Sequence, residues 1–216
     1  MKPLMRSGVL CALTLCLAAL PAGAATVTFT TSVPLQLTDW YTTINLPKFD
    51  PSQGTLTQVS FDVSDSLVHK IEFENQSPTS HSTVRDSVYV TVDVQRPAST
   101  SLVSAVAKLY RTATVSTYDG TLDYAGTSGI TLDGLTATAT GSGVTSAPAD
   151  LTLFSGTGTI ALPCQAEAYF MFSYSGGNAR FRLTTQATAR VSVTYTYDRA
   201  LPAHATSWGR IKSLYR

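Results

Sequence analysis

The sequence predicts an all-β protein folded as an antiparallel β-sandwich. Three observations support this: polar and apolar residues alternate with a period of two in several segments, turn-forming residues separate those segments, and Thr, Val and Tyr are abundant. The alternation marks strands that bury one face and expose the other. Strand order is not encoded in such a pattern, so a jelly-roll and an immunoglobulin-like topology are equally compatible with it.

The clearest strand lies at residues 87–95, SVYVTVDVQ, where valine occupies every second position. Residues 59–63 and 67–73 repeat the alternation. Ser64, Asp65 and Ser66 lie between these two runs, and three small polar residues in a row predict a turn there.

The longest alternation runs through residues 160–174, and a Ser-Gly-Gly-Asn hairpin signal follows at residues 175–178. Pro163 falls inside this run. Because proline donates no backbone hydrogen bond, we expect a sheet edge or a bend at that residue. A last strand is predicted at residues 190–197.

Two segments are ambiguous. Residues 99–112 fit either one helix or one strand, because their apolar residues satisfy both periods. Residues 118–150 are rich in Gly, Thr, Ser and Ala, which is compatible with a flexible linker. Since leucine and isoleucine still recur there, we favour short strands joined by tight glycine turns. In total about nine or ten short strands are expected.

The first residues resemble a secretory signal peptide. Two basic residues precede a mostly apolar run at residues 8–20, and Ala-Gly-Ala follows at residues 22–24, which predicts cleavage after Ala24. The apolar run is shorter than the roughly 20 residues that span a bilayer. We therefore expect export, no membrane span after cleavage, a single β-sandwich domain at residues 25–198 and a disordered tail at residues 199–216.

The charge and the cysteine content limit the kinds of function and of crosslink that the sequence allows. Residues 25–216 carry 13 basic and 14 acidic residues, a net charge of 13 − 14 = −1. Such a balance argues against binding to nucleic acid, which needs a strong positive field. Cys11 and Cys16 lie in the predicted signal peptide, so only Cys164 is left and no intramolecular disulfide is expected. Cys164 is predicted to be a small buried strand residue.

The sequence contains none of the usual catalytic or metal-binding motifs. It has no G-x-S-x-G, H-E-x-x-H, P-loop or dinucleotide-binding glycine pattern, and His69, His81 and His204 are far apart. We therefore predict no enzymatic activity, no catalytic residue, no cofactor and no metal site. The Asp and Gly residues near positions 119–134 leave calcium as an open alternative, but their spacing does not match a calcium loop and favours turns.

Carbohydrate binding is the more serious functional possibility. β-Sandwich modules hold sugars on exposed aromatic rings, because a flat ring contacts the C–H face of a sugar while polar neighbours bind its hydroxyl groups. The sequence offers several aromatic candidates: Trp40, Tyr41, Tyr89, Tyr110, Tyr118, Tyr124, Tyr169 and Trp208. Among them, Trp40, Tyr41 and Tyr89 are the predicted sugar contacts.

One segment departs from the Thr/Val alternation: residues 45–56, NLPKFDPSQGTL. Pro47 is expected to end a strand, and the Asp50 side chain to accept hydrogen bonds from the amides that follow it. Gly54 is free to adopt a positive φ before the next strand begins. The segment is therefore predicted to be a β-connection that fixes where the next strand enters its sheet.

Three segments together resemble the choice-of-anchor E domain of exported bacterial proteins. They are NLPKFDPSQGTLTQVSFDVSDSL, KIEFENQSPTSHSTVRDSVYVTVDV and TARVSVTYTYD, and the likeness covers about residues 38–198. That family is named for its varied C-terminal sorting signals, often a PEP-CTERM segment. The sequence departs from the family after Asp198, where it shows neither Pro-Glu-Pro nor an apolar run. The resemblance implies a secreted or surface-displayed protein and supplies no catalytic residues.

Taken together, these features predict a non-enzymatic exported protein, secreted or at the cell surface. We expect it to serve as a structural or interaction module of the bacterial envelope or extracellular (biofilm) matrix. The alternative is a carbohydrate-binding module for exopolysaccharide. Its expected partners are extracellular polysaccharide or other envelope components.

Overall fold

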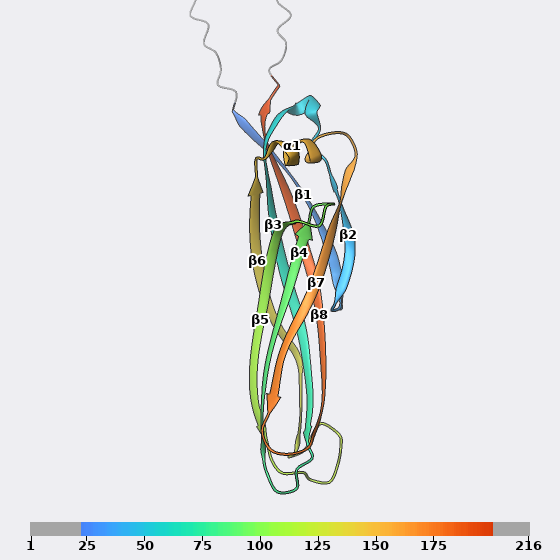
Figure 1. Cartoon of the computed structure of the whole chain (residues 1–216), viewed down its shortest axis with the longest axis vertical. Coiled ribbons are helices and arrows are strands. Elements are labelled where there is room, and N and C mark those ends of the chain that lie inside the picture. The colour runs from blue at the N-terminus through green and yellow to red at the C-terminus, as the bar shows by residue number, and fades with distance from the viewer. Residues whose placement is uncertain (1–22, 201–216) are drawn as a thin grey trace, which may run out of the picture.

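The computed structural model describes residues 23–200, which form an elongated sandwich of two antiparallel sheets (Figure 1). All strands follow the long axis of the molecule. The elements of this described part are β1 (Ala24–Leu37), β2 (Trp40–Pro47), η1 (Pro51–Gln53), β3 (Gly54–Asn75), β4 (Ser82–Gln95), β5 (Ser101–Val115), β6 (Gly129–Thr145), α1 (Pro148–Phe154), β7 (Thr159–Tyr174) and β8 (Ala179–Arg199).

The strand order decides between the two topologies that the sequence left open. One sheet has the order β1-β8-β3-β6 and the other β2-β7-β4-β5. The first strand thus pairs with the last, the second with the seventh, the third with the sixth and the fourth with the fifth. This is one long hairpin rolled into two sheets, the arrangement of a jelly-roll. The prediction of an antiparallel β-sandwich is confirmed.

The predicted turn at Ser64, Asp65 and Ser66 is wrong, because β3 runs through these residues without interruption. β3 pairs with β8 on one side and with β6 on the other along this stretch. Hydrogen bonds on both sides keep the strand extended, whatever the local preference of three small polar residues. Asp65 consequently points into the core, between Val63 and Leu67 on the buried face.

The segment of residues 118–150 also differs from the prediction. Instead of several short strands it contains the single long strand β6 and the first residues of the short helix α1. Of the ambiguous residues 99–112, those from Ser101 onward belong to strand β5. Glycine within β6 has a packing role, because β5 and β6 are the strands that meet where the two sheets approach each other. A Cβ atom on Gly141 would overlap the carbonyl oxygen of Ser104 in β5, and one on Gly143 that of Leu102.

Two local expectations agree with the structure. Pro163 in β7 pairs with Thr43 of β2, while pairing with β4 ends one residue later, at Cys164 and Val94. Pro163 thus lies where β7 pairs with β2 but no longer with β4, so the missing amide hydrogen of the proline is tolerated. Cys164 itself is fully buried.

The connection after β2 follows the expected turn chemistry. β2 ends at Pro47, and Asp50 accepts a hydrogen bond of 2.9 Å from the amide of Ser52 at the start of η1. Gly54 opens β3 with a φ of 153°, and a Cβ there would overlap the carbonyl oxygen of Asp198. This close approach lets β3 enter beside β8, as residues 54 and 199 pair.

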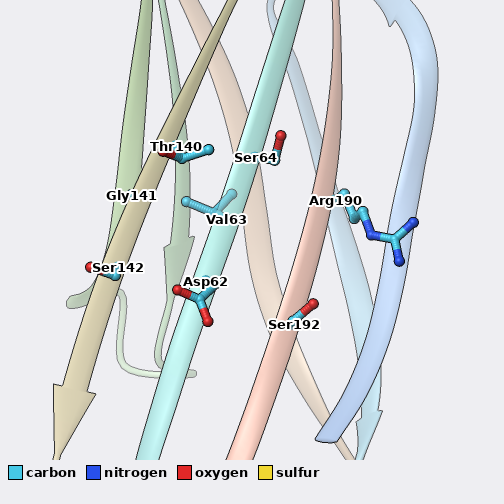
Figure 2. Close-up of a pocket in the computed structure, with 8 residues that line it drawn as sticks. All are labelled: Asp62, Val63, Ser64, Thr140, Gly141, Ser142, Arg190 and Ser192. Carbon is cyan, nitrogen blue, oxygen red and sulfur yellow. The ribbon is translucent and has the colours of Figure 1, made fainter.

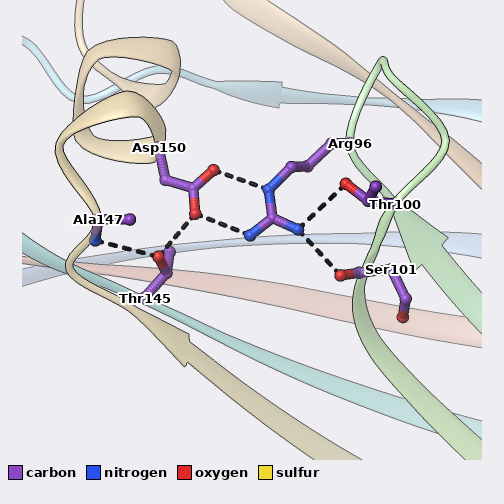
Figure 3. A network of polar contacts seen from close by, with 6 residues as sticks. All are labelled: Arg96, Thr100, Ser101, Thr145, Ala147 and Asp150. Carbon is purple, nitrogen blue, oxygen red and sulfur yellow. Dashed lines mark hydrogen bonds and ion pairs between the residues drawn. The ribbon is translucent and has the colours of Figure 1, made fainter.

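The end of the sandwich at which β1 begins is closed by α1 (Figure 1). Phe154 of α1 is fully buried and packs against Phe61 of β3, with ring centroids 5.2 Å apart. Arg96, from the turn between β4 and β5, forms an ion pair with Asp150 of the helix (Figure 3). The helix is thus attached to both sheets.

The apolar core is divided into two clusters along the long axis. The larger cluster ends near Leu67 of β3 and Val88 of β4, and the smaller begins with Ile71 and Val84 of the same strands. Between them lie three buried polar side chains, which we call the polar layer: His69, Asp86 and Thr185. The turn between β1 and β2 reaches this level, since the amide of Thr38 donates to the carbonyl oxygen of Thr185 over 3.0 Å.

The predicted signal peptide falls almost entirely outside the described residues, as does the predicted disordered tail beyond Ala200. Within residues 23–200, no helix is long and apolar enough to cross a membrane.

Candidate functional site

Three tyrosines gather on the outer face of the β2-β7-β4-β5 sheet. Tyr169 of β7 stands directly opposite Tyr89 of β4, and Lys108 of β5 stands opposite Tyr89 on its other side. Tyr110, two residues beyond Lys108, shares the same face. We call these four residues the tyrosine surface. The alternation of each strand turns these side chains outward because their immediate neighbours in β4 and β5, such as Val88 and Leu109, are buried.

The rings of the tyrosine surface contact one another. The hydroxyl groups of Tyr89 and Tyr110 are hydrogen-bonded at 2.8 Å, and their rings meet edge to face with centroids 5.7 Å apart. The ring of Tyr169 lies 6.4 Å from that of Tyr89. The ammonium group of Lys108 lies 5.5 Å from the centre of the Tyr89 ring, within reach of a cation–π interaction.

This surface combines exposed rings with fixed polar groups. Tyr169 is 64% exposed and Tyr110 54% exposed. The hydrogen bond with Tyr110 raises the pKa of Tyr89 above its ordinary value, so the Tyr89 phenol stays neutral near neutral pH. Exposed rings beside one cation suit a ligand with a flat apolar face and several hydroxyl groups.

The three sugar contacts predicted from the sequence have different positions. Tyr89 lies at the centre of the tyrosine surface. Tyr41 lies on the same outer face, 66% exposed, opposite Gln165 of β7 rather than beside the other tyrosines. Trp40 points the other way: it is 8% exposed, and its indole nitrogen donates to the carbonyl oxygen of Ala187 over 3.3 Å. The Trp40 ring is therefore part of the core and does not fit the predicted role.

Tyr110 and Tyr169 are among the aromatic candidates of the sequence, but the sequence does not place them beside Tyr89. Their alternation with buried residues was visible, but the proximity of three tyrosines depends on the register in which β4 pairs with β5 and β7. No local signal in one strand reports the register of its neighbours.

The opposite sheet carries a hollow of about 360 Å³ on its outer face (Figure 2). Its lining is polar apart from Val63 and Gly141, with one acidic and one basic side chain, Asp62 and Arg190. Hydroxyl groups come from β3, β6 and β8: Ser64, Thr140, Ser142 and Ser192. The hollow has no aromatic side chain, so it offers hydrogen bonds to a ligand but no apolar platform.

In the polar layer, the hydroxyl of Thr185, the imidazole of His69 and the carboxylate of Asp86 follow one another in space. Nδ1 of His69 lies 2.7 Å from the hydroxyl oxygen of Thr185, and Nε2 of His69 lies 3.3 Å from Oδ2 of Asp86. The order resembles that of a hydrolase triad. However, His69 and Asp86 are essentially unexposed and Thr185 is 4% exposed. The layer is therefore a structural network within the core.

The Asp and Gly residues at positions 119–134 form turns. Asp119 accepts hydrogen bonds from the amides of Thr121 and Thr127, and these bonds lower the pKa of Asp119. Asp123 accepts one from the amide of Ala125. Residues 23–200 contain no group of three or more His, Cys, Asp or Glu side chains placed to hold a metal ion.

No family model matches the chain, and no curated protein sequence does. Among solved structures, the chain is similar to that of the Gx strain of infectious bursal disease virus, with 11% identity over 88% of this chain and 48% of that chain and a TM-score of 0.13. The VP2 subviral particle of the same virus gives 9% identity, coverage of 90% and 49%, and a TM-score of 0.12. The chain thus spans about half the length of the structures it matches, and these TM-scores are too low to bear on its function.

Proposed function

We propose that this protein is a non-enzymatic exported module of the bacterial envelope or extracellular matrix, and that its tyrosine surface binds polysaccharide. Export is inferred from the signal-peptide pattern of residues 1–24. The observation that supports polysaccharide binding is the contact of Tyr89 with Tyr110 and Tyr169 on an open sheet face.

The chemistry of the surface favours a sugar over other ligands. A sugar ring presents C–H groups on one face and hydroxyl groups at its rim. The exposed rings of Tyr110 and Tyr169 can stack against the C–H face, while their phenol groups exchange hydrogen bonds with the rim. Glu167, the exposed residue two positions before Tyr169 on the same face of β7, adds an acceptor. A flat, open surface suits a polymer chain better than a small molecule, which needs a pocket to bury most of its area.

The test is affinity electrophoresis of the exported chain in gels that contain matrix polysaccharides, combined with a glycan array. We expect retardation by at least one polysaccharide, and a loss of about tenfold or more in affinity in Tyr169→Ala, which removes the most exposed ring of the tyrosine surface. Tyr110→Phe, which keeps the ring and loses only the hydroxyl, should weaken binding less. Tyr118→Ala serves as the matched control, because Tyr118 lies in the loop between β5 and β6.

Two results would reject the proposal. One is that no matrix polysaccharide retards the wild-type chain. The other is that Tyr169→Ala and Tyr118→Ala bind equally well, which would place the contact elsewhere, with the polar hollow of Figure 2 as the next surface to examine.

A further inference from the structure

Within residues 23–200, one side of the sandwich has no covering strand along about half of its length. β2 pairs with residues 159–166 of β7, and β1 pairs with residues 186–198 of β8. Beyond the turn that joins β1 to β2, β7 pairs only with β4, and β8 only with β3. Residues 168–174 of β7 therefore present a free edge, which begins where Asp39 accepts a hydrogen bond of 2.6 Å from the amide of Ala168.

Aromatic side chains fill the gap between the sheets along this free edge. Phe172 of β7 and Phe181 of β8 stack with ring centroids 4.5 Å apart, and Tyr174 lies 6.2 Å from Phe181. These residues have the inward parity of their strands, yet Phe181 is 46% exposed and Tyr174 40% exposed, because none of the described strands covers this side. An apolar surface beside unpaired backbone groups is a site for the addition of a strand.

The composition of the free edge indicates what would pair with it. Residues 168–174, AYFMFSY, contain no charge, no proline and no glycine. Edge strands that stay unpaired are usually protected by charged residues, proline or bulges. An uncharged edge meets no repulsion when it pairs with its own copy, whichever residue of 168–174 lies at the centre of the pair.

The charges that flank the edge lie on the outer faces of the two sheets. Glu167 has the outward parity of β7, whereas Arg180 and Arg182 have the outward parity of β8 in the opposite sheet. These charges therefore point away from the edge, on opposite sides of the sandwich, and leave residues 168–174 themselves uncharged.

We propose that two copies of this chain associate through residues 168–174 of β7, paired antiparallel about a two-fold axis. The partner's strand pairs with the part of β7 that β2 does not reach, beyond Asp39. It joins the two β2-β7-β4-β5 sheets into one continuous sheet and shields the aromatic side chains of the open side. This interface uses the backbone edge of β7, whereas the tyrosine surface lies on the outer face of the sheet; Tyr169 belongs to both.

The test compares the oligomeric state of the exported chain, from micromolar to millimolar concentration, with that of Met171→Lys. Met171 is 47% exposed and has the outward parity of β7, so the substitution places a charge on the edge without disturbing the core. We expect a concentration-dependent dimer in the wild type and at least tenfold weaker association in Met171→Lys. Val144→Lys, on the opposite edge strand β6, is the matched control and should dimerise normally. Ser173→Lys replaces Met171→Lys if the latter lowers the melting temperature.

Hydrogen exchange identifies the surface involved. Protection of the amides of residues 168–174 should rise with protein concentration in the wild type and not in Met171→Lys. The proposal is overturned by a chain that stays monomeric at millimolar concentration, or by a dimer that Met171→Lys leaves intact. Protection of these amides that does not depend on concentration also overturns it, because that would mean that a segment of the same chain covers the edge.

Discussion

Arg96 and Asp150, 54 residues apart in the sequence, form a two-point ion pair in which Nε lies 2.7 Å from Oδ1 and Nη2 lies 2.7 Å from Oδ2. Thr145 donates a further hydrogen bond of 2.6 Å to Asp150, and Nη1 of Arg96 donates to the carbonyl oxygen of Ser101 (Figure 3). The pair connects the turn between β4 and β5 with the helix that closes the end of the sandwich.

Replacement of Asp150 by alanine should lower the free energy of unfolding by about 1–3 kcal/mol, because the guanidinium group and the Thr145 hydroxyl lose their acceptor. Urea denaturation measures the change. Arg96→Lys, which keeps the charge but not the planar fork, is the graded control and should cost less. Equal stability of wild type and Asp150→Ala would show that the pair does not hold α1 in place.

The same pair makes stability depend on pH. The guanidinium group of Arg96 lowers the pKa of Asp150 below its ordinary value. A carboxyl group whose pKa is lowered by folding stabilises the folded state above its unfolded pKa, near 4, and this contribution is lost as the pH falls below that value. The stability difference between wild type and Asp150→Asn should therefore be largest near pH 6 and shrink below pH 4.

The contribution of Asp65 to stability depends on pH in the opposite direction. Burial raises the pKa of Asp65 to about 7, and the backbone of Ala107 offsets only part of that rise. Because the folded state then binds the proton more tightly than the unfolded state, the stabilisation is complete below pH 4 and is lost as the pH rises to about 7. Asp65→Asn should remove this loss and stabilise the protein at pH 8, on the order of 3 kcal/mol at most. Denaturation at pH 5 and pH 8 tests it, and an unchanged pH dependence in Asp65→Asn would contradict it.

His69 and Asp86 should show strong energetic coupling. Removing the imidazole leaves the Asp86 carboxyl buried without its partner, so His69→Leu alone should cost about 3 kcal/mol or more. The double variant, His69→Leu with Asp86→Leu, should cost less than the sum of the two single variants, because no buried polar group of this pair is left without its partner. A double-mutant cycle by urea denaturation measures the coupling, and additive effects would mean that the two side chains act independently.

Gly141→Ala tests the close approach of β5 and β6. A Cβ would overlap the backbone oxygen of Ser104, which cannot move without shifting β5, so we expect a loss of at least about 2 kcal/mol in unfolding free energy. Ser142→Ala, one residue further along β6 and outward-facing, is the control and should change stability by less than about 0.5 kcal/mol. An unchanged free energy of unfolding in Gly141→Ala would show that the two strands separate easily.

Several features could be predicted because their cause is local. The alternation of valine in residues 87–95 predicted β4, and the chemistry of Asp50 and Gly54 predicted the turn before β3. The turn predicted at Asp65 was wrong because pairing with β8 and β6, which lie far away in the sequence, decides the backbone there. The prediction for Trp40 was limited in the same way, because it too depends on a contact with a distant segment. A large aromatic residue near a strand end suits both a sugar platform and the core, and only the packing against β8 distinguishes them.

By itself the sequence determined that the protein is an antiparallel β-sandwich, because side-chain alternation is a property of each strand alone. Only the tertiary structure decided the jelly-roll order, the division of the core by His69, Asp86 and Thr185, and the meeting of Tyr89 with Tyr110 and Tyr169. All of these depend on which strands pair and in which register. That choice comes from the combined burial of the whole chain and leaves no mark in any short segment.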